Sequence, residues 1–135
     1  MATWDVGALD NDEAQDFLAE WQESEDYALV DELLSDVLDM GESYLEADLG
    51  ARTIASGAVL SAVVNEAIEE LFDGDEDSVD WAFGLPQPKV ALLNKLVRSL
   101  KRILKEESEL REQWEETDDF DGWRATVREI IADLT

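Results

Sequence analysis

The side chains that could do chemistry in this chain are mainly carboxylates. Its 135 residues include 35 Asp and Glu but no His and no Cys. Without these two residue types there is no Ser-His or Cys-His nucleophile pair, no zinc site built from imidazole or thiolate, and no Glu-x-x-His di-iron site of the helical-bundle kind. Paired carboxylates could still act as general acid and base, as in glycoside hydrolysis. The open chemistry is that of carboxylates, amines, hydroxyls and phenols.

A catalytic carboxylate would need a buried setting that shifts its pKa. The acidic residues fall on polar faces of predicted helices, and so many acids produce accidental pairs that carry little information. Glu66 comes closest to an apolar setting because Ala62, Val63 and Ala67 lie beside it. We expect Glu66 to be solvated or salt-bridged near a helix end. The sequence therefore indicates no catalytic residue and no cofactor, and we expect the protein not to be an enzyme.

One acidic run has partial calcium-loop spacing. The sequence DGDEDS starts at Asp73 and places Asp at positions 1, 3 and 5. An EF-hand loop also needs Gly at position six and Glu at position twelve, where this chain has Ser78 and Gly84. This excludes an EF-hand and predicts a solvated acidic loop, with weak cation binding as the alternative. We expect no specific metal site.

The charge of the chain is large and unevenly distributed. Ten Lys and Arg against 35 acids leave a net charge of −25. Residues 1–50 hold 16 acids and no base, whereas residues 87–105 hold six bases and no acid. Such a surface opposes direct binding of a nucleic-acid backbone, and it opposes anionic membranes for the same reason. It is compatible with a basic protein partner or with a salty cytoplasm.

Two oppositely charged helix faces are the candidate contact surfaces. A helix predicted at about 26–40 carries an acidic outer face made of Asp31, Glu32, Asp36 and Asp39. A helix predicted at about 88–105 carries a basic face opposite its apolar one, made of Lys95, Arg98, Lys101, Arg102 and Lys105. We expect these bases to lie against acidic neighbours within the fold. The alternative is contact with an acidic partner or a second copy of the chain.

Helical periodicity extends through nearly all the sequence. It predicts an all-α fold, a compact single domain over 1–135 with five or six helices around a central apolar one. The predicted helices span about 11–23, 26–40, 47–71, 88–105, 107–116 and 121–134. The third is apolar almost all round, as expected of a helix packed on several sides. Gly57 in its middle indicates close backbone packing.

Residues 73–88 are predicted to be an ordered loop that joins the first three helices to the C-terminal ones. Both prolines of the chain lie here, at 86 and 88. We expect Trp81 and Phe83 to anchor this loop to the core. The most apolar stretch, Thr53–Val64, has about half the length needed to span a bilayer. The opening residues lack a basic region followed by an apolar run, so we expect a cytoplasmic protein.

The start of the chain combines a Trp, a Gly and an Asn-Asp pair before an amphipathic helix. Asp10 or Asn11 can cap that helix, and Asp10 with Glu13 has capping-box spacing. Gly7 suits a backbone turn. The alternative function for this segment is a small polar or metal site at the helix start, formed by Asp10, Asn11 and Asp12.

The same segment has the pattern W-x-x-G-x-x-x-N-D-x-A-x-D-F, formed by Trp4, Gly7, Asn11, Asp12, Ala14, Asp16 and Phe17. In this pattern it resembles a known bacterial family, domain of unknown function 4259. Asp5 stands where the family usually has Gly, and Leu9 where it has Phe. Later landmarks extend the resemblance over most of the chain, among them Tyr44-Leu45-Glu46 and Trp114-Glu115-Glu116. The family has no agreed activity, so the resemblance implies no mechanism.

The leading hypothesis is a non-enzymatic acidic binding protein that engages a basic protein through the face at Asp31, Glu32, Asp36 and Asp39. An immunity or inhibitor protein that neutralises a basic nuclease is one example, by analogy only. The first alternative is a nucleic-acid mimic that occupies a DNA-binding cleft. The second is an acidic surface that reflects salt adaptation, with no specific partner. A carboxylate enzyme is the least favoured, and the sequence does not determine an oligomeric state.

Overall fold

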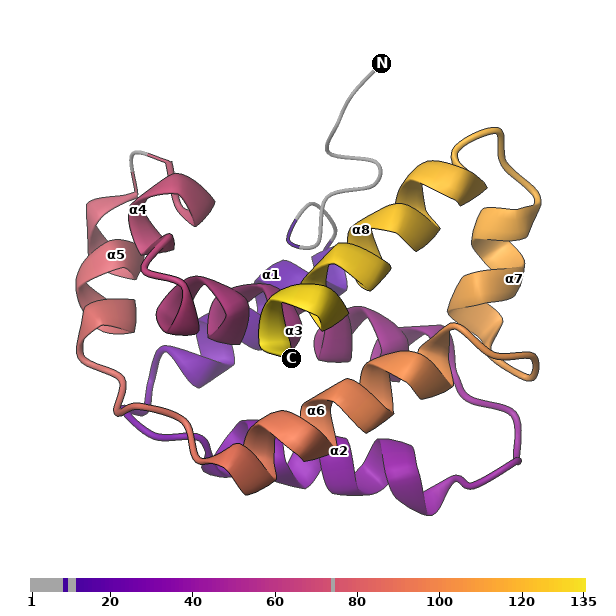
Figure 1. The fold of residues 1–135 in the computed structure, drawn as a ribbon, viewed down its shortest axis with the longest axis horizontal. Coiled ribbons are helices and arrows are strands. Elements are labelled where there is room, and N and C mark those ends of the chain that lie inside the picture. Colours follow the sequence, from indigo (N-terminus) through magenta and orange to yellow (C-terminus); the bar gives the residue numbers. More distant parts are fainter. Residues whose placement is uncertain (1–8, 10–11, 74) are drawn as a thin grey trace.

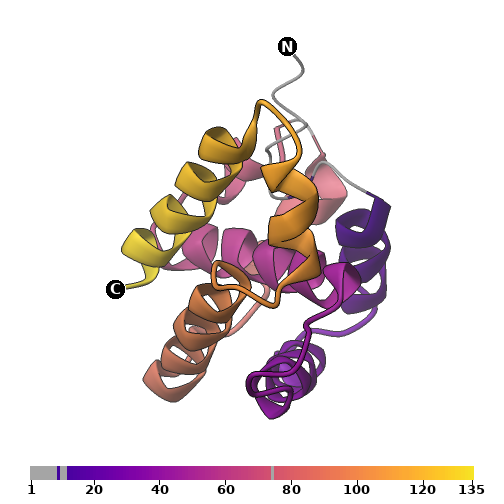
Figure 2. The same cartoon turned by 90° about the vertical axis from the view of Figure 1, so that its right-hand side faces the viewer.

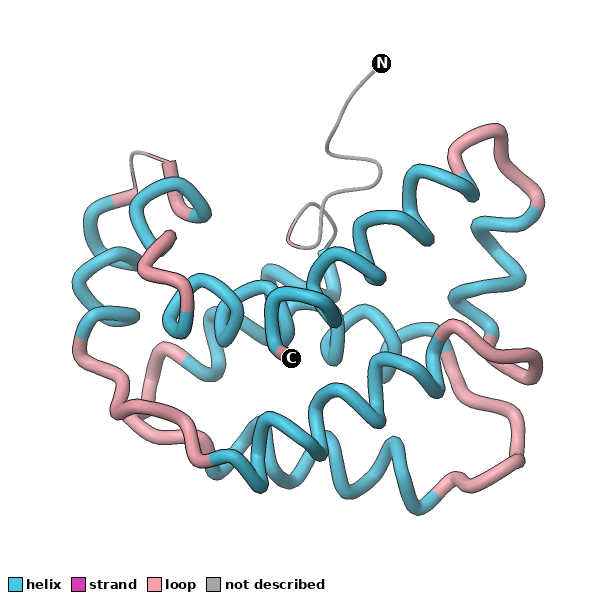
Figure 3. Tube along the Cα trace, in the orientation of Figure 1, coloured by secondary structure: helices cyan, strands magenta, loops and turns pink. Residues whose placement is uncertain are grey.

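The computed structural model describes residues 9, 12–73 and 75–135, which form eight helices (Figures 1 and 3). They are α1 (Asp12–Trp21), α2 (Ala28–Asp39), α3 (Ala47–Val64), α4 (Ile68–Leu71), α5 (Glu76–Phe83), α6 (Val90–Ile103), α7 (Glu109–Glu115) and α8 (Phe120–Leu134). The all-α prediction is confirmed, and over these ranges the extended pairing is one isolated bridge between Leu45 and Ser108. The predicted count of five or six helices is wrong, for two reasons given below.

Helix α3 lies at the centre of the molecule. It contacts α1, α2, α6, α7 and α8, and both ribbon views show it surrounded by them (Figures 1 and 2). A Cβ on Gly57 would lie 2.9 Å from Cγ2 of Ile130 on α8 and 3.2 Å from Cδ1 of Leu100 on α6. Two helices therefore approach α3 at this glycine, as the sequence predicted.

Helix α3 ends at Val64, seven residues before the predicted end at 71. Glu66 adopts a left-handed conformation with φ of 57°, and the Ala67 amide donates to the Ala62 carbonyl at 2.9 Å. This is the hydrogen bond of a Schellman C-cap, which usually places Gly where Glu66 stands. The short helix α4 follows in a new direction, so one predicted helix is two.

The segment 73–88, predicted to be a loop, contains helix α5. The Asp75 carboxylate caps this helix by accepting from the Ser78 amide, and Glu76 and Asp77 occupy its first turn. Trp81 anchors it as expected, because its ring lies edge-on to Trp21 at 4.9 Å and its indole N–H donates to the Ser24 carbonyl at 2.8 Å. The prediction for Phe83 is wrong, since its side chain is 61% exposed.

The N-terminal sequence pattern lies partly outside the described residues. Trp4, Gly7 and Asn11 are not described, and neither is Asp10, so the proposed cap and turn remain predictions. Helix α1 begins at Asp12, with Ala14 and Phe17 buried and Asp16 exposed. The described half of the pattern thus supplies the buried stripe of a helix that packs on α3.

Helix α3 is also the one described helix long and apolar enough to span a membrane. It has 18 residues, and 67% of it is buried among the other helices. A core helix surrounded by protein has this same composition, because all of its faces are apolar. The observation is therefore weak support for a membrane span.

Candidate interaction face on helices α2 and α6

The two charged helix faces predicted from the sequence lie next to each other in the fold. Helices α2 and α6 are in contact and together form the lower layer of Figure 1, where both run from left to right. Contacts near both ends agree with this parallel direction. Lys95 reaches Asp31 near the N-terminal ends, and Arg102 reaches the Gly41 carbonyl beyond the end of α2.

Lys95 and Asp31 neutralise each other between the two helices. The Lys95 ammonium lies 2.9 Å from Oδ1 of Asp31 and donates to Oγ of Ser35 at 2.6 Å. The Lys95 side chain is 26% exposed and that of Asp31 is 59% exposed. One residue of the predicted acidic face and one of the predicted basic face are thus already paired within the chain.

Arg102 is used within the fold as well. Its guanidinium donates to backbone carbonyls in the segments that follow the two helices. They are Gly41 (2.8 Å) and Ser43 (2.6 Å) after α2, and Glu106 (3.3 Å) and Glu107 (3.1 Å) after α6. The planar guanidinium of Arg carries several N–H donors in a rigid fork, so it can donate to several carbonyls at once. Arg102 therefore joins the loop after α2 to the end of α6.

The remaining members of the acidic set form an exposed stripe on α2. Glu32, Asp36 and Asp39 are spaced i, i+4 and i+7, and all three are exposed. None of their carboxylates has a hydrogen-bond or ion-pair partner in the described part of the chain. We call these three residues the acidic ridge.

The remaining members of the basic set form a matching stripe on α6. Arg98, Lys101 and Lys105 are spaced i, i+3 and i+7 along α6 and its end, are exposed, and have no hydrogen-bond or ion-pair partner among residues 9, 12–73 and 75–135. We call them the basic ridge. At about 100° per residue, each ridge is rotated about a quarter turn from the side that faces the other helix. The apolar sides face α3, so both ridges point outward on the same side of the pair.

A groove of about 730 Å³ lies between the N-terminal ends of α2 and α6. Its charged lining comprises Asp26, Asp31, Lys89 and Lys95. Tyr27 also lines it, and its hydroxyl donates to the Pro86 carbonyl at 2.6 Å. Burial raises the pKa of Tyr27 to about 12 from its ordinary value of 10.0. The groove therefore presents two acidic and two basic side chains near the N-terminal end of the two ridges.

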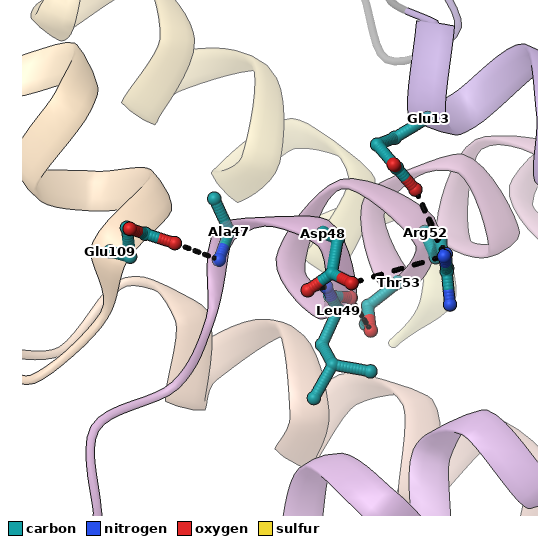
Figure 4. Close-up of polar contacts among 7 residues, drawn as sticks. All are labelled: Glu13, Ala47, Asp48, Leu49, Arg52, Thr53 and Glu109. Carbon is teal, nitrogen blue, oxygen red and sulfur yellow. Dashed lines mark hydrogen bonds and ion pairs between the residues drawn. The ribbon is translucent and has the colours of Figure 1, made fainter.

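Other carboxylates have structural roles at the start of α3 (Figure 4). Arg52, the one base in the first 86 residues, lies 3.0 Å from Glu13 of α1 and 3.9 Å from Asp48 of its own helix. Glu109 of α7 accepts from the Ala47 amide at 2.8 Å. These acids cap α3 and join it to α1 and α7, so they are not free for a partner.

The family model for a domain of unknown function, DUF4259, matches residues 2–126. The chain belongs to the DUF4259 family. The matched range includes α1 to α7 and the first half of α8, so both ridges and the groove lie within the family domain. No curated protein and no solved structure showed significant similarity to the chain.

A second hollow in the DUF4259 domain lies where α3, α4 and α8 meet. It has a volume of about 360 Å³, and its lining includes Ala62, Leu71, Ile130 and three acids, Glu70, Glu129 and Asp133. Asp133 is engaged, because Oγ of Ser61 donates to it at 3.3 Å. The exposed Glu70 and Glu129 provide an acidic surface, far from α2 in sequence, for comparison with the acidic ridge.

Across the described residues of the DUF4259 domain, no group of three or more carboxylates is placed to hold a metal ion. The acidic run that begins at Asp73 helps to form α5 instead. Hydrogen bonds from the hydroxyl and amide of Ser78 lower the pKa of Asp75, consistent with its role as a helix cap. Glu66, the acid closest to an apolar setting in the sequence, is exposed at the turn between α3 and α4.

Proposed function

We propose that this chain is a protein-binding domain whose acidic ridge engages a basic protein. The proposal rests on Glu32, Asp36 and Asp39, whose carboxylates lie exposed along one stripe of α2. These three carboxylates have no hydrogen-bond or ion-pair partner among the described residues. A helix packed on α3 and α6 holds them at constant spacing. A partner's Lys and Arg side chains could therefore pair with them without ordering a loop.

The charge of the whole chain supports the same proposal. A net charge of −25 would attract a basic protein over a distance and accelerate its association. The local carboxylate array would then select the orientation of the complex. An immunity-type or inhibitor-type protein is one form that such a domain could take, and its role requires no catalytic group.

The packing of the helices around α3 offers no support for a nucleic-acid mimic. Such a mimic would be expected to be elongated, with acids in a regular double row. In this chain the unpartnered acids on α2 form a single ridge on a helix that contacts the one carrying the basic ridge. The basic protein partner is therefore the function that we put forward.

A salt-graded pull-down with the full chain tests the proposal. The ridge variant carries Glu32→Gln, Asp36→Asn and Asp39→Asn. The matched control carries Glu69→Gln, Glu70→Gln and Glu129→Gln, three exposed acids on α4 and α8 with the same change in charge. At low salt we expect the wild type and the control to retain the same basic protein, and the ridge variant to bind about tenfold more weakly, as expected for three exposed ion pairs.

Two results would contradict the proposal. If the wild type retains no basic protein at low salt, the acidic ridge has no such partner under these conditions. If the control loses as much binding as the ridge variant, generic acidity accounts for the retention. Either result would favour salt adaptation as the explanation of the acidic surface.

A further inference from the structure

The basic ridge is the unexplained feature of this acidic chain. Five of the ten Lys and Arg bond to protein oxygen atoms, namely Arg52, Lys95, Arg102, Arg111 and Arg124. Of the other five, Lys89 and Arg128 are exposed and have no such partner in the described ranges, and the remaining three are the cations of the basic ridge, which have none there either. In a chain of net charge −25, exposed acids could readily have neutralised them. Their grouping on one stripe beside the acidic ridge therefore calls for a partner outside the chain.

We propose that this partner is a second copy of the chain, bound face to face through both ridges in a two-fold dimer. Consider a two-fold axis that lies at the surface between α2 and α6 and follows the mean direction of the two helices. Rotation about this axis places the acidic ridge of each copy opposite the basic ridge of the other. The two contacts are identical, as an isologous interface requires.

A two-fold rotation leaves the position of each residue along the axis unchanged. The two ridges can therefore pair only if they lie at about the same height along the two helices. The Lys95 ammonium contacts both Asp31 and Ser35, so residue 95 of α6 lies about level with residues 31–35 of α2. By that alignment Arg98 lies level with residues 34–38, Lys101 with 37–41 and Lys105 with 41–45. At about 1.5 Å per residue, Arg98 and Lys101 are then within about 3 Å, along the axis, of an acidic-ridge residue of the other copy, and Lys105 lies about 3–9 Å beyond Asp39.

The ionic-strength dependence of this dimer is distinctive. At low salt the long-range repulsion between two chains of net charge −25 opposes association. At physiological salt the screening length is roughly 8 Å, which weakens that repulsion more than it weakens ridge pairs in contact. At molar salt the ridge pairs are screened as well. Dimerisation should therefore be strongest at intermediate salt.

Sedimentation velocity of the purified full chain, over a range of concentration and KCl, tests the dimer. In the first variant the basic ridge becomes acidic through Arg98→Glu, Lys101→Glu and Lys105→Glu. In the second the acidic ridge becomes basic through Glu32→Lys, Asp36→Lys and Asp39→Lys. We expect the wild type to dimerise, each variant alone to be monomeric, and an equimolar mixture of the two variants to form a heterodimer. Mixing restores opposite charges in both contacts.

Two further variants serve as controls. Lys101→Glu and Asp36→Lys, each made singly, repeat the mixing experiment with a smaller perturbation of the fold, which circular dichroism monitors. Glu69→Lys, Glu70→Lys and Glu129→Lys together change the net charge as much as the second variant does but leave both ridges intact. This last variant should still dimerise.

The dimer is overturned if the wild type is monomeric at every salt concentration, if the mixture fails to associate although both variants are folded, or if the control variant is monomeric. Such failure is distinct from failure of the basic-partner proposal, which this inference does not require. The first variant keeps the acidic ridge, so it should lose the dimer and still bind a basic protein. In the wild type, a basic partner would compete with the second copy.

Discussion

The two tyrosines of this chain have raised pKa values for different physical reasons. For Tyr27 the cause is burial, which disfavours the phenolate and raises the pKa to about 12. For Tyr44 the largest cause is the hydrogen bond from its hydroxyl to the Glu112 carboxylate, at 2.7 Å, followed by burial and by the nearby negative charges, and its pKa is also raised to about 12. The hydrogen bond to Glu112 can be removed with a single substitution.

We predict that Glu112→Gln lowers the pKa of Tyr44 toward its ordinary value of 10.0, because both the charged acceptor and its negative charge are lost. Alkaline titration of phenolate absorbance would measure this shift, with Tyr27→Phe as the background that isolates Tyr44. A Tyr44 pKa that stays near 12 in Glu112→Gln would contradict the assignment.

The raised pKa of Tyr27 also has a consequence for stability. The folded chain favours the neutral phenol, so the contribution of Tyr27 is complete below pH 10.0 and is lost as the pH rises to about 12.

At the level of the helices, the position of Gly57 explains how α6 and α8 approach α3. The two helices leave no room for a Cβ there, with Ile130 Cγ2 at 2.9 Å and Leu100 Cδ1 at 3.2 Å. Overpacking of a core costs about 1–3 kcal/mol. The gain in helix propensity from Gly to Ala is about 1 kcal/mol, so the steric effect outweighs it.

We therefore predict that Gly57→Ala lowers the free energy of unfolding by about 1 kcal/mol net. Gly122 is a matched control because it lies within α8 but is exposed. Gly122→Ala should raise the free energy of unfolding by about 0.5–1 kcal/mol through helix propensity alone. Urea denaturation would measure both variants. Equal stabilisation by the two substitutions would show that α3 is not closely packed at Gly57.

For the whole molecule, the question is whether its charge or its core determines folding. The buried cluster is apolar and joins residues of α1, α2, α3, α6 and α8. The five ion pairs of the described chain each involve a side chain that is more than a third exposed, and such pairs contribute little. The excess acids mainly repel one another, so they oppose folding.

We predict that helix content is already complete at low salt, and that the melting temperature rises with KCl and then levels off as the repulsion is screened. Circular dichroism from low to molar KCl would measure both quantities. A chain that folds only in molar KCl would instead support salt adaptation of the acidic surface.

Local patterns in the sequence were sufficient to predict the all-helical class, the central position of the third helix and the family. Each of these depends on features within a few turns of the chain. The all-round apolar character of α3 predicts burial on every side, and Gly57 predicts close packing. The end of α3 was missed because a Glu, instead of Gly, adopts the left-handed conformation at Glu66. Helix α5 was missed although Asp75 and the acids after it form an ordinary helix start.

The interaction face depended on tertiary structure. Helical spacing is local, so the sequence could predict which side of each helix is charged. It could not predict that α2 and α6 lie side by side and parallel, which pairs Asp31 with Lys95 and commits Arg102 to backbone carbonyls. The partners of a long charged side chain depend on which other helix packs within its reach. Only the packing of both helices on α3 determined which members of these two charged faces have no partner within the described chain.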